Sequence, residues 1–288
     1  MSLSIPSDPL SPACYPPPPP HPPLRARSYE ETVAFSAYVN QAVGAAPQLA
    51  HRLPIAPATL VRACADGVVL CHLVNEAAAG SVPERLINRR EPLSIFQATE
   101  NCNHAIAAVR ALGCPVVNIG ARDITEEKTI LLLALLWQII KAKISSQVSL
   151  AACPRLRLLR EPGESEAAFA ALPVEQLLLR WFNHQLHWAG AARRLRNLDR
   201  DLADAECYAA LLRRLGRGGG GARVLALERC RTPRRLAEHV INAAATDLGV
   251  AAVIHAAHIT SGNARLNMAF IAQLVSAAAA AVTARWQC

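Results

Sequence analysis

One segment of this chain, residues 113–144, constrains its fold more than any other. Its sequence, GCPVVNIGARDITEEKTILLLALLWQIIKAKI, begins as a short β-branched loop and continues into a helix that is apolar on every side over residues 130–136. A helix without a polar face is typical of a protein core. The apolar stretch, residues 129–140, is 12 residues long, whereas a membrane-spanning helix needs about 20. We therefore expect the central helix of a domain and no membrane span.

Charged residues at both ends of this segment fit the direction of a helix dipole. Either Asp123 or Thr125 is a suitable N-cap. Acids are favoured in the first turn of a helix and cations in the last, and the sequence supplies two of each: Glu126 and Glu127, then Lys141 and Lys143. The central helix is therefore expected to begin near Thr125 and to end near Ile144.

Length and composition favour two helical domains. The chain has 288 residues, of which 52% are hydrophobic and only 5% aromatic. Domains commonly hold about 100 to 200 residues, so two ordinary cores can be formed. Abundant alanine and few aromatic residues favour helices that pack through small side chains over a strand-rich sandwich. The expected fold class is all-α.

The net charge of +8 comes almost entirely from one region, residues 191–235, where twelve Arg stand against five acids. Such a patch can attract nucleic acid, an anionic membrane or an acidic protein surface. Tyr208 is the one aromatic residue within it, which is unlike a nucleic-acid-binding surface. A coding bias explains the composition equally well, because 27 of the 30 basic residues are Arg. We expect no nucleic-acid partner.

The sequence shows no pattern of an enzyme or of a metal site. Its nine cysteines form no Cys-x-x-Cys pair and most stand in apolar helical context, which predicts reduced core residues. The pair Cys71 and His72 and the pair Cys102 and His104 are expected on two separate helices, with spacings that match no zinc site. A nucleophile with a recognisable base and a pair of catalytic carboxylates are missing too. We expect no cofactor and no catalysis and, without a signal peptide, a cytoplasmic location.

Residues 1–27 are predicted to form a disordered, proline-rich tail. They include the sequence PACYPPPPPHPPL, whose run from Pro16 to Pro20 should adopt the polyproline II conformation. Such a run can dock on the aromatic groove of a polyproline-binding protein. A solvated leader without a partner is the equal alternative, and the sequence leaves both open.

Three helices are expected to precede the central one in the first domain, residues 28–144. Apolar residues at helical spacing predict the first at residues 29–44 and the third at about residues 99–112. The second opens at the pair Asp66 and Gly67 with the sequence VVLCHLVNEA. On it we expect His72 and Asn75 to face the solvent.

The plan of the first domain repeats after a linker, residues 145–172. Three pairs of landmark residues are separated by a nearly constant 135 to 138 positions: Asp66 and Asp204, Gly113 and Gly249, Ile124 and Ile259. A constant offset indicates an internal duplication. The second domain is expected at residues 173–284, with helix starts marked by Pro173, Asp204, Pro233 and Asn263.

These segments resemble a tandem pair of calponin-homology modules, and specifically the first actin-binding domain of the fimbrin or plastin family. The first module carries DGVVLCHLVN (66–75), ERLINRR (84–90), ENCNHAI (100–106), GCPVVNIG (113–120) and LLWQIIK (135–141) in the family's order. The second carries EQLLLRWFN (175–183) and ITSGNARLNMAFIAQL (259–274). The resemblance covers about residues 28–276 and implies two four-helix modules side by side.

The resemblance implies binding to the side of F-actin in the cytoplasmic actin cytoskeleton through three helices, at residues 31–43, 126–143 and 174–188. Their apolar residues are expected to hold the fold, so the candidate contacts are polar: Asn40, Gln41, Lys128, Gln138, Lys141, Lys143, Arg180 and His184. Each could equally belong to a solvated helix face. A handful of interface residues normally carries most of the binding energy.

Two departures from the family bear on regulation and on crosslinking. Fimbrins carry calcium-binding EF-hands ahead of this domain, but the loop pattern D-x-[DN]-x-[DN]-G does not occur in this sequence, so we expect no calcium control. Fimbrins also carry a second actin-binding domain. Here we expect crosslinking only through self-association, or if the sequence is part of a longer chain. The alternative function is a calponin-homology scaffold that has lost actin and binds microtubules or signalling proteins.

Overall fold

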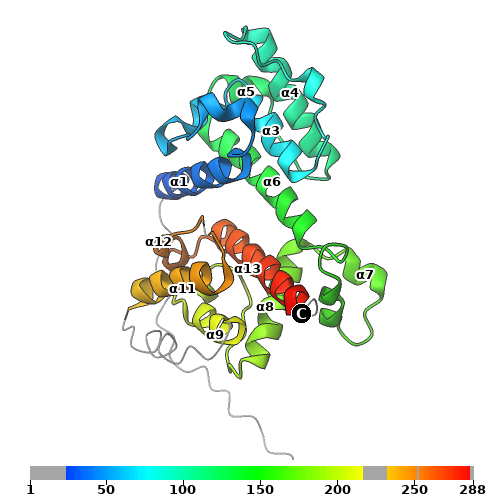
Figure 1. Ribbon diagram of the computed structural model, residues 1–288, viewed down its shortest axis with the longest axis vertical. Helices are drawn as coiled ribbons and strands as arrows, with labels where there is room; N and C mark the ends of the chain where they lie inside the picture. Colours follow the sequence, from blue (N-terminus) through cyan, green and yellow to red (C-terminus); the bar gives the residue numbers. More distant parts are fainter. Residues whose placement is uncertain (1–23, 217–231, 252, 286–288) are drawn as a thin grey trace, which may run out of the picture.

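The structure is a computed structural model that describes residues 24–216, 232–251 and 253–285. Within these residues it contains helices, turns and loops and no strand. Figure 1 shows two helical modules stacked along the long axis, the first formed by α1 to α6 and the second by α8 to α13. The predicted all-α class and the tandem arrangement of two modules are thus confirmed.

The first module contains four main helices and two short ones. Their bounds are α1 Leu24–Val43, α2 Leu60–Cys64, α3 Val68–Ala77, α4 Ile95–Ala111, α5 Ala121–Thr125 and α6 Thr129–Gln147. Short 3-10 turns lie at Pro47–Arg52, Pro57–Thr59 and Glu84–Leu86. Helix α1 begins at Leu24, so residues 24–27 are helical although the sequence assigns them to the tail.

Helix α6 is the core helix that the sequence predicts, but both of its ends differ from the prediction. Residues Asp123 and Thr125 belong to the separate helix α5. Glu127 then adopts a left-handed backbone conformation, with a φ of 57°, which separates α5 from α6. The acids therefore precede α6 and do not fill its first turn. At the other end the helix continues to Gln147, so Lys143 is not in its last turn.

The apolar surface of α6 is also less completely buried than the sequence suggests. Eight of its side chains are buried, among them Leu133 and Trp137, whereas Ile130 is 76% exposed. By length and composition alone α6 could cross a membrane, yet the core helix of a folded domain passes the same test. Its packing against α1, α3, α4 and α13 identifies it as such a core helix.

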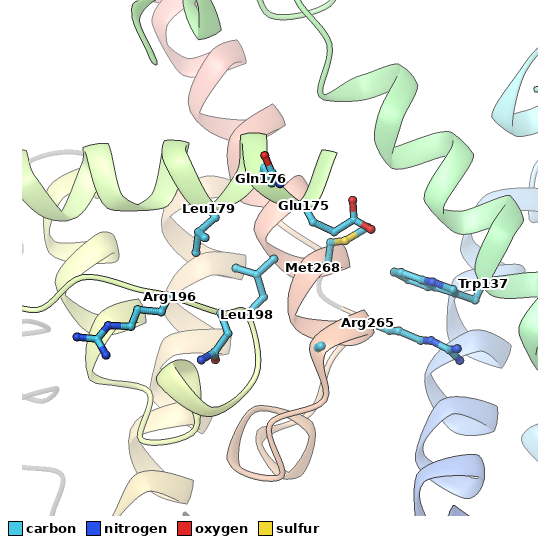
Figure 2. A pocket seen from close by; sticks show the side chains of 10 residues that line it. Trp137, Glu175, Gln176, Leu179, Arg196, Leu198, Arg265 and Met268 are labelled. Atoms are coloured by element: carbon cyan, nitrogen blue, oxygen red, sulfur yellow. The ribbon is translucent and has the colours of Figure 1, made fainter. Parts of the chain in front are cut away.

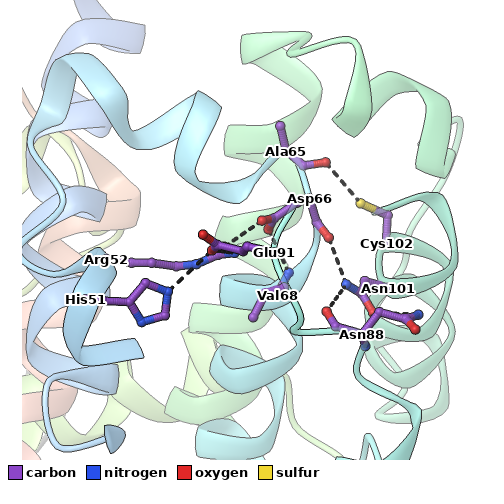
Figure 3. Close-up of polar contacts among 9 residues, drawn as sticks. All are labelled: His51, Arg52, Ala65, Asp66, Val68, Asn88, Glu91, Asn101 and Cys102. Carbon is purple, nitrogen blue, oxygen red and sulfur yellow. Dashed lines mark hydrogen bonds and ion pairs between the residues drawn. The ribbon is translucent and has the colours of Figure 1, made fainter. Parts of the chain in front are cut away.

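The start of α3 requires a glycine. Gly67 has a φ of 75°, and a Cβ atom there would lie 2.5 Å from the backbone nitrogen of Cys102. The Asn101 side chain ties the same turn to its surroundings, since its amide donates to the carbonyl oxygens of Asp66 at 3.1 Å and Asn88 at 2.9 Å. Figure 3 shows this network, in which Arg52 also pairs with Asp66 at 2.6 Å. These contacts lock α3 against α4.

Three smaller expectations for the first module are wrong. His72 is buried, with 8% of its surface exposed, because α3 packs against both α4 and α6. Asn75 does not point freely into solvent, since it binds the backbone nitrogen and oxygen of Val82, each at 2.8 Å. Helix α4 begins at Ile95, ahead of the predicted residue 99, because Ser94 and Gln97 form a capping box.

The second module repeats the first. Its helices are α8 Val174–Trp188, α9 Glu206–Leu215, α11 Pro233–Leu248, α12 Ala256–Thr260 and α13 Ala264–Arg285. Pro173 is the N-cap residue of α8, one position before the predicted one, whereas Pro233 opens α11 as predicted. Tyr208 lies at the centre of the core, where its ring contacts Phe182 and Phe270 and its hydroxyl donates to Asn267.

The linker packs onto the second module as two short helical pieces, η4 Pro154–Leu159 and α7 Glu166–Ala170. Its buried side chains, Leu156, Leu159 and Phe169, belong to one hydrophobic cluster that is continuous through both modules. The two modules and the linker therefore share a core. The proline run 16–20 and residues 217–231 of the Arg-rich region 191–235 lie outside the described residues.

Candidate functional site

The two modules meet through α1 and α6 on one side and α8 and the start of α13 on the other (Figure 1). Arg265 at the start of α13 bonds Glu31 of α1 at 3.0 Å, and its guanidinium lies 5.7 Å from the centre of the Trp137 ring. Lys141 of α6 pairs with Glu175 of α8 at 2.5 Å. These contacts join all three helices that the sequence assigns to the candidate site.

An open cavity of about 400 Å³ lies at this junction (Figure 2). The first module contributes Trp137 to its wall, and the remaining lining residues come from the second module: Glu175, Gln176, Leu179, Arg196, Asn197, Leu198, Ala264, Arg265 and Met268. The cavity is closed on one side by the Trp137 and Arg265 pair. Its shape therefore depends on the two modules staying together.

The two candidate residues at the end of α1 have different environments. Asn40 uses its whole amide within the molecule, because Oδ1 accepts from the Ile55 nitrogen at 2.7 Å and Nδ2 donates to the Ile55 oxygen at 2.8 Å. Gln41, the next residue, is exposed. The first therefore holds the loop after α1, whereas the second is accessible to a partner.

Four candidate residues lie along α6. Lys128, its exposed N-cap, pairs with Asp123 at 2.6 Å and with Glu126 at 3.4 Å, and the bond to Asp123 raises the pKa of its amine. Lys143 reaches across to Glu76 of α3 at 3.0 Å. Lys141 makes the bridge to α8, and Gln138, one turn before it, is half-buried with its Oε1 atom fully covered. Lys128, Lys141 and Lys143 thus each form an ion pair with a carboxylate of the same chain.

The two candidates on α8 also have intramolecular partners. Arg180 donates two hydrogen bonds to the Glu164 carboxylate in the linker turn, with N–O distances of 2.6 and 3.1 Å. Its guanidinium lies 5.8 Å from the centre of the Phe169 ring. His184 accepts a hydrogen bond from the indole of Trp188 at 3.1 Å. Arg180 therefore fixes the linker to α8.

The structure does not gather the eight candidates into one patch. Lys141 lies where α6 meets α8 and Arg180 lies where α8 meets the linker, whereas Gln41, Lys128 and His184 lie near the ends of three different helices. Sequence reasoning missed Glu31 and Arg265, because a contact between modules leaves no local pattern. It also missed the exposed Ile130, because it assigned apolar residues of this helix to the core.

The cysteines suit a packing role better than metal binding. Burial raises the pKa of Cys71 and of Cys102 to about 12, and their thiols donate to the backbone oxygens of Asn101 and Ala65. A metal ligand must be a thiolate, which these environments disfavour. In the part of the chain that the structure describes, no group of three His, Cys, Asp or Glu side chains could hold a metal ion.

The fold and the junction between its modules define a tandem calponin homology protein. The model of the calponin homology (CH) domain matches residues 35–145 and 172–280, and the chain belongs to this family. Among its relatives are fimbrin of Dictyostelium discoideum, 36% identical over 249 residues, and human plastin-1, 35% identical over 253 residues. Each match covers 86% of this chain and 40% of the relative. The resemblance to fimbrin and plastin is confirmed.

A solved structure supports the same relationship in three dimensions. The actin-crosslinking core of Schizosaccharomyces pombe fimbrin is similar to this chain with a TM-score of 0.71 and 30% sequence identity. The match covers 86% of this chain and 50% of the solved one. This chain thus spans about half, or less, of the proteins it resembles.

Proposed function

We propose that this chain binds the side of actin filaments through its tandem calponin homology modules. The observation that carries the proposal is the similarity of 86% of the chain to a fimbrin actin-crosslinking core. It acts by binding and not by catalysis, in the cytoplasmic actin cytoskeleton. The division into a first domain at 28–144, a linker at 145–172 and a second domain at 173–284 is part of this proposal.

The contact surface that the geometry supports best lies on the first module. Gln41 at the end of α1 is exposed, as are Lys128 and Ile130 at the start of α6, so both helices offer accessible side chains to a partner. An apolar side chain beside polar and charged ones is the usual composition of a protein interface. Lys141, Lys143 and Arg180 support this surface indirectly. Their ion pairs join α6 to α8, α6 to α3 and α8 to the linker, respectively.

Co-sedimentation with F-actin and with microtubules, at low and high salt, tests the proposed partner. We expect saturable pelleting with F-actin that weakens with salt, because exposed charges are screened. Pelleting with microtubules and not with F-actin would support the alternative, a scaffold that has lost actin. Pelleting with neither polymer would reject both.

Paired variants test the proposed surface. Lys128→Gln should lower the affinity for F-actin by about threefold, the modest effect expected of a single exposed charge. Arg122→Gln is the matched control, because Arg122 is exposed and shares Glu126 as a partner. Ile130→Ser should weaken binding more than Ile95→Ser, whose side chain is 61% exposed on α4. Equal effects within each pair would exclude the start of α6 from the contact.

The run from Pro16 to Pro20 remains a proposed ligand for a polyproline-binding protein. Its prolines match the extended peptides that dock on aromatic grooves. Pull-down with the full chain and with a chain lacking residues 1–23 tests this. A partner retained equally by both would reject the assignment.

A further inference from the structure

The exposed end of α8 carries a cluster of aromatic and basic side chains that the proposed function does not use. Trp188, the last residue of the helix, is 62% exposed. Its indole Nε1 donates a hydrogen bond of 3.1 Å to Nε2 of His184, one turn earlier. An indole N–H can only donate, so His184 must present a lone pair at Nε2 and carries its proton at Nδ1. The bond therefore requires a neutral imidazole.

A second histidine stands in a comparable arrangement beside the first. The ring of His187 lies 5.8 Å from the Trp188 ring, and its Nδ1 is 3.3 Å from a guanidinium nitrogen of Arg194. The charged or titratable groups that face the cluster are His187 on α8, Arg194 on the following loop and Arg214 on α9.

The surroundings of His184 favour the neutral imidazole near pH 7. Its pKa lies below the ordinary value of 6.5, first because of burial and then because of His187 and Arg214. A proton on His184 would bring a positive charge close to His187 and to the Arg214 guanidinium, which disfavours the protonated form. Acidification is therefore the change that breaks the bond to Trp188.

We propose that the pair of His184 and Trp188 is a proton-operated switch at the end of α8. A proton taken from solvent by Nε2 of His184 converts an acceptor into a donor, so the two N–H groups then oppose each other. The bond breaks, the exposed indole is released, and the surface gains one positive charge. No covalent bond changes in this step, and loss of the proton restores the original contact.

The switch has a consequence for filament binding that rests on the proposed function. The family resemblance implies a filament contact for α8 in addition to the surface proposed on the first module, so added positive charge and a freed indole favour an acidic partner surface at low pH. His184→Gln is the matched variant, because its side-chain oxygen accepts the same indole hydrogen bond without titrating near neutral pH. His184→Gln should therefore keep the hydrogen bond to Trp188 at every pH between 5 and 8.

Tryptophan emission of the full chain, titrated from pH 8 to pH 5, tests the switch directly. The difference between the wild type and Trp188→Phe isolates the signal of Trp188. We expect one transition with a midpoint below 6.5, absent in His184→Gln and shifted upward in His187→Gln, because His187 lowers the pKa of His184. Circular dichroism at both limits checks that each variant stays folded. The same transition in folded His184→Gln would overturn the proposal.

Co-sedimentation with F-actin at pH 7.5 and pH 6.0 separates the switch from the proposed function. The affinity ratio of wild type to His184→Gln cancels the pH response of the filament itself. We expect this ratio to rise by about two- to fivefold on acidification, as one added interface charge allows. An emission transition without a change in this ratio would support the switch and overturn the assignment of α8 to the filament contact.

Discussion

Two asparagines, one in each module, hold equivalent loops in the same way. Asn40 binds both backbone groups of Ile55, and Asn183 binds the nitrogen and oxygen of Leu195 at 2.7 and 2.9 Å. Asp66 and Asp204 repeat a second contact, each accepting from the backbone nitrogen two residues later at 3.1 Å. The duplication predicted from spacing is thus reproduced by individual hydrogen bonds.

Removing either asparagine amide should destabilise the fold. Asn183→Ala leaves two backbone groups of the following loop without their partner, which costs about 1 to 3 kcal/mol for each group that stays buried. Asn40→Ala should behave alike, so any loss of F-actin binding would follow the loss of stability. Urea unfolding of both variants measures this. A change below about 0.5 kcal/mol would show that the amides are dispensable.

Trp137 and Trp188 form a natural pair for testing burial. Trp137 is 8% exposed and Trp188 is 62% exposed. Trp137→Ala should lower the free energy of unfolding by about 3 to 5 kcal/mol, as a large-to-small core substitution does. Trp188→Ala should change it by only about 0.5 kcal/mol. Equal thermal unfolding midpoints for Trp137→Ala and Trp188→Ala would contradict the burial of Trp137 on α6.

Stability should fall on acidification because of a buried histidine in α12. His258 is 3% exposed, and burial, followed by His255, lowers its pKa from 6.5 to about 4. Since the folded pKa is the lower one, the stabilising contribution is complete above pH 6.5 and is lost as the pH falls towards 4. His258→Gln keeps an acceptor for the His255 backbone nitrogen without titrating.

Chemical denaturation between pH 7 and pH 4 compares the two proteins. The wild type should lose stability more steeply than His258→Gln, by up to about 1.4 kcal/mol per pH unit, the limit for one proton. Parallel curves would show that His258 is not the responsible group.

At the scale of elements, helix starts with side-chain caps are well determined locally. In α4, Ser94 accepts from the Gln97 nitrogen at 3.3 Å, and the Gln97 side chain accepts from the Ser94 nitrogen at 3.0 Å. Ser94→Ala should cost about 0.5 to 2 kcal/mol, whereas Ser94→Asp should restore most of the loss. Thermal unfolding measures both. An aspartate variant as unstable as the alanine variant would contradict a capping role.

The predicted elements show which information a sequence carries. The starts of α3 and α11 were predictable because Gly67 and Pro233 impose local backbone geometry. The start of α6 was not, because the acids before it satisfy the rules for a first turn, whereas the tertiary structure places them in α5 and the following turn. Local capping rules cannot distinguish one long helix from a short helix followed directly by a long one.

At the scale of the whole molecule, the junction between modules depends on contacts between residues far apart in sequence. Arg265 contacts Glu31 and Trp137 at once, and Lys141 bridges to Glu175. Hydrophobic periodicity predicted the helices and landmark spacing predicted the duplication, but neither pattern identifies these pairs of residues. For the same reason the polar candidates were found by position on a helix, while their intramolecular partners were not.

A double-mutant cycle measures the strength of this junction. Glu31→Gln and Arg265→Gln each remove one charge of the pair, and their combined effect should be smaller than the sum of the single effects by about 0.5 to 1.5 kcal/mol. The coupling energy is modest because the Arg265 guanidinium is partly exposed, so that water screens the ion pair. Urea unfolding supplies all four free energies. Strict additivity would show that the two side chains do not interact in solution.

We propose that the chain lies along the side of an actin filament with its first module in contact. Cryo-electron microscopy of filaments saturated with the chain tests it most directly. We expect regular density on the filament side, with the end of α1 and the start of α6 facing actin at Gln41, Lys128 and Ile130. Filaments that stay bare at saturating protein, or that bind the chain with these residues facing solvent, would contradict the account.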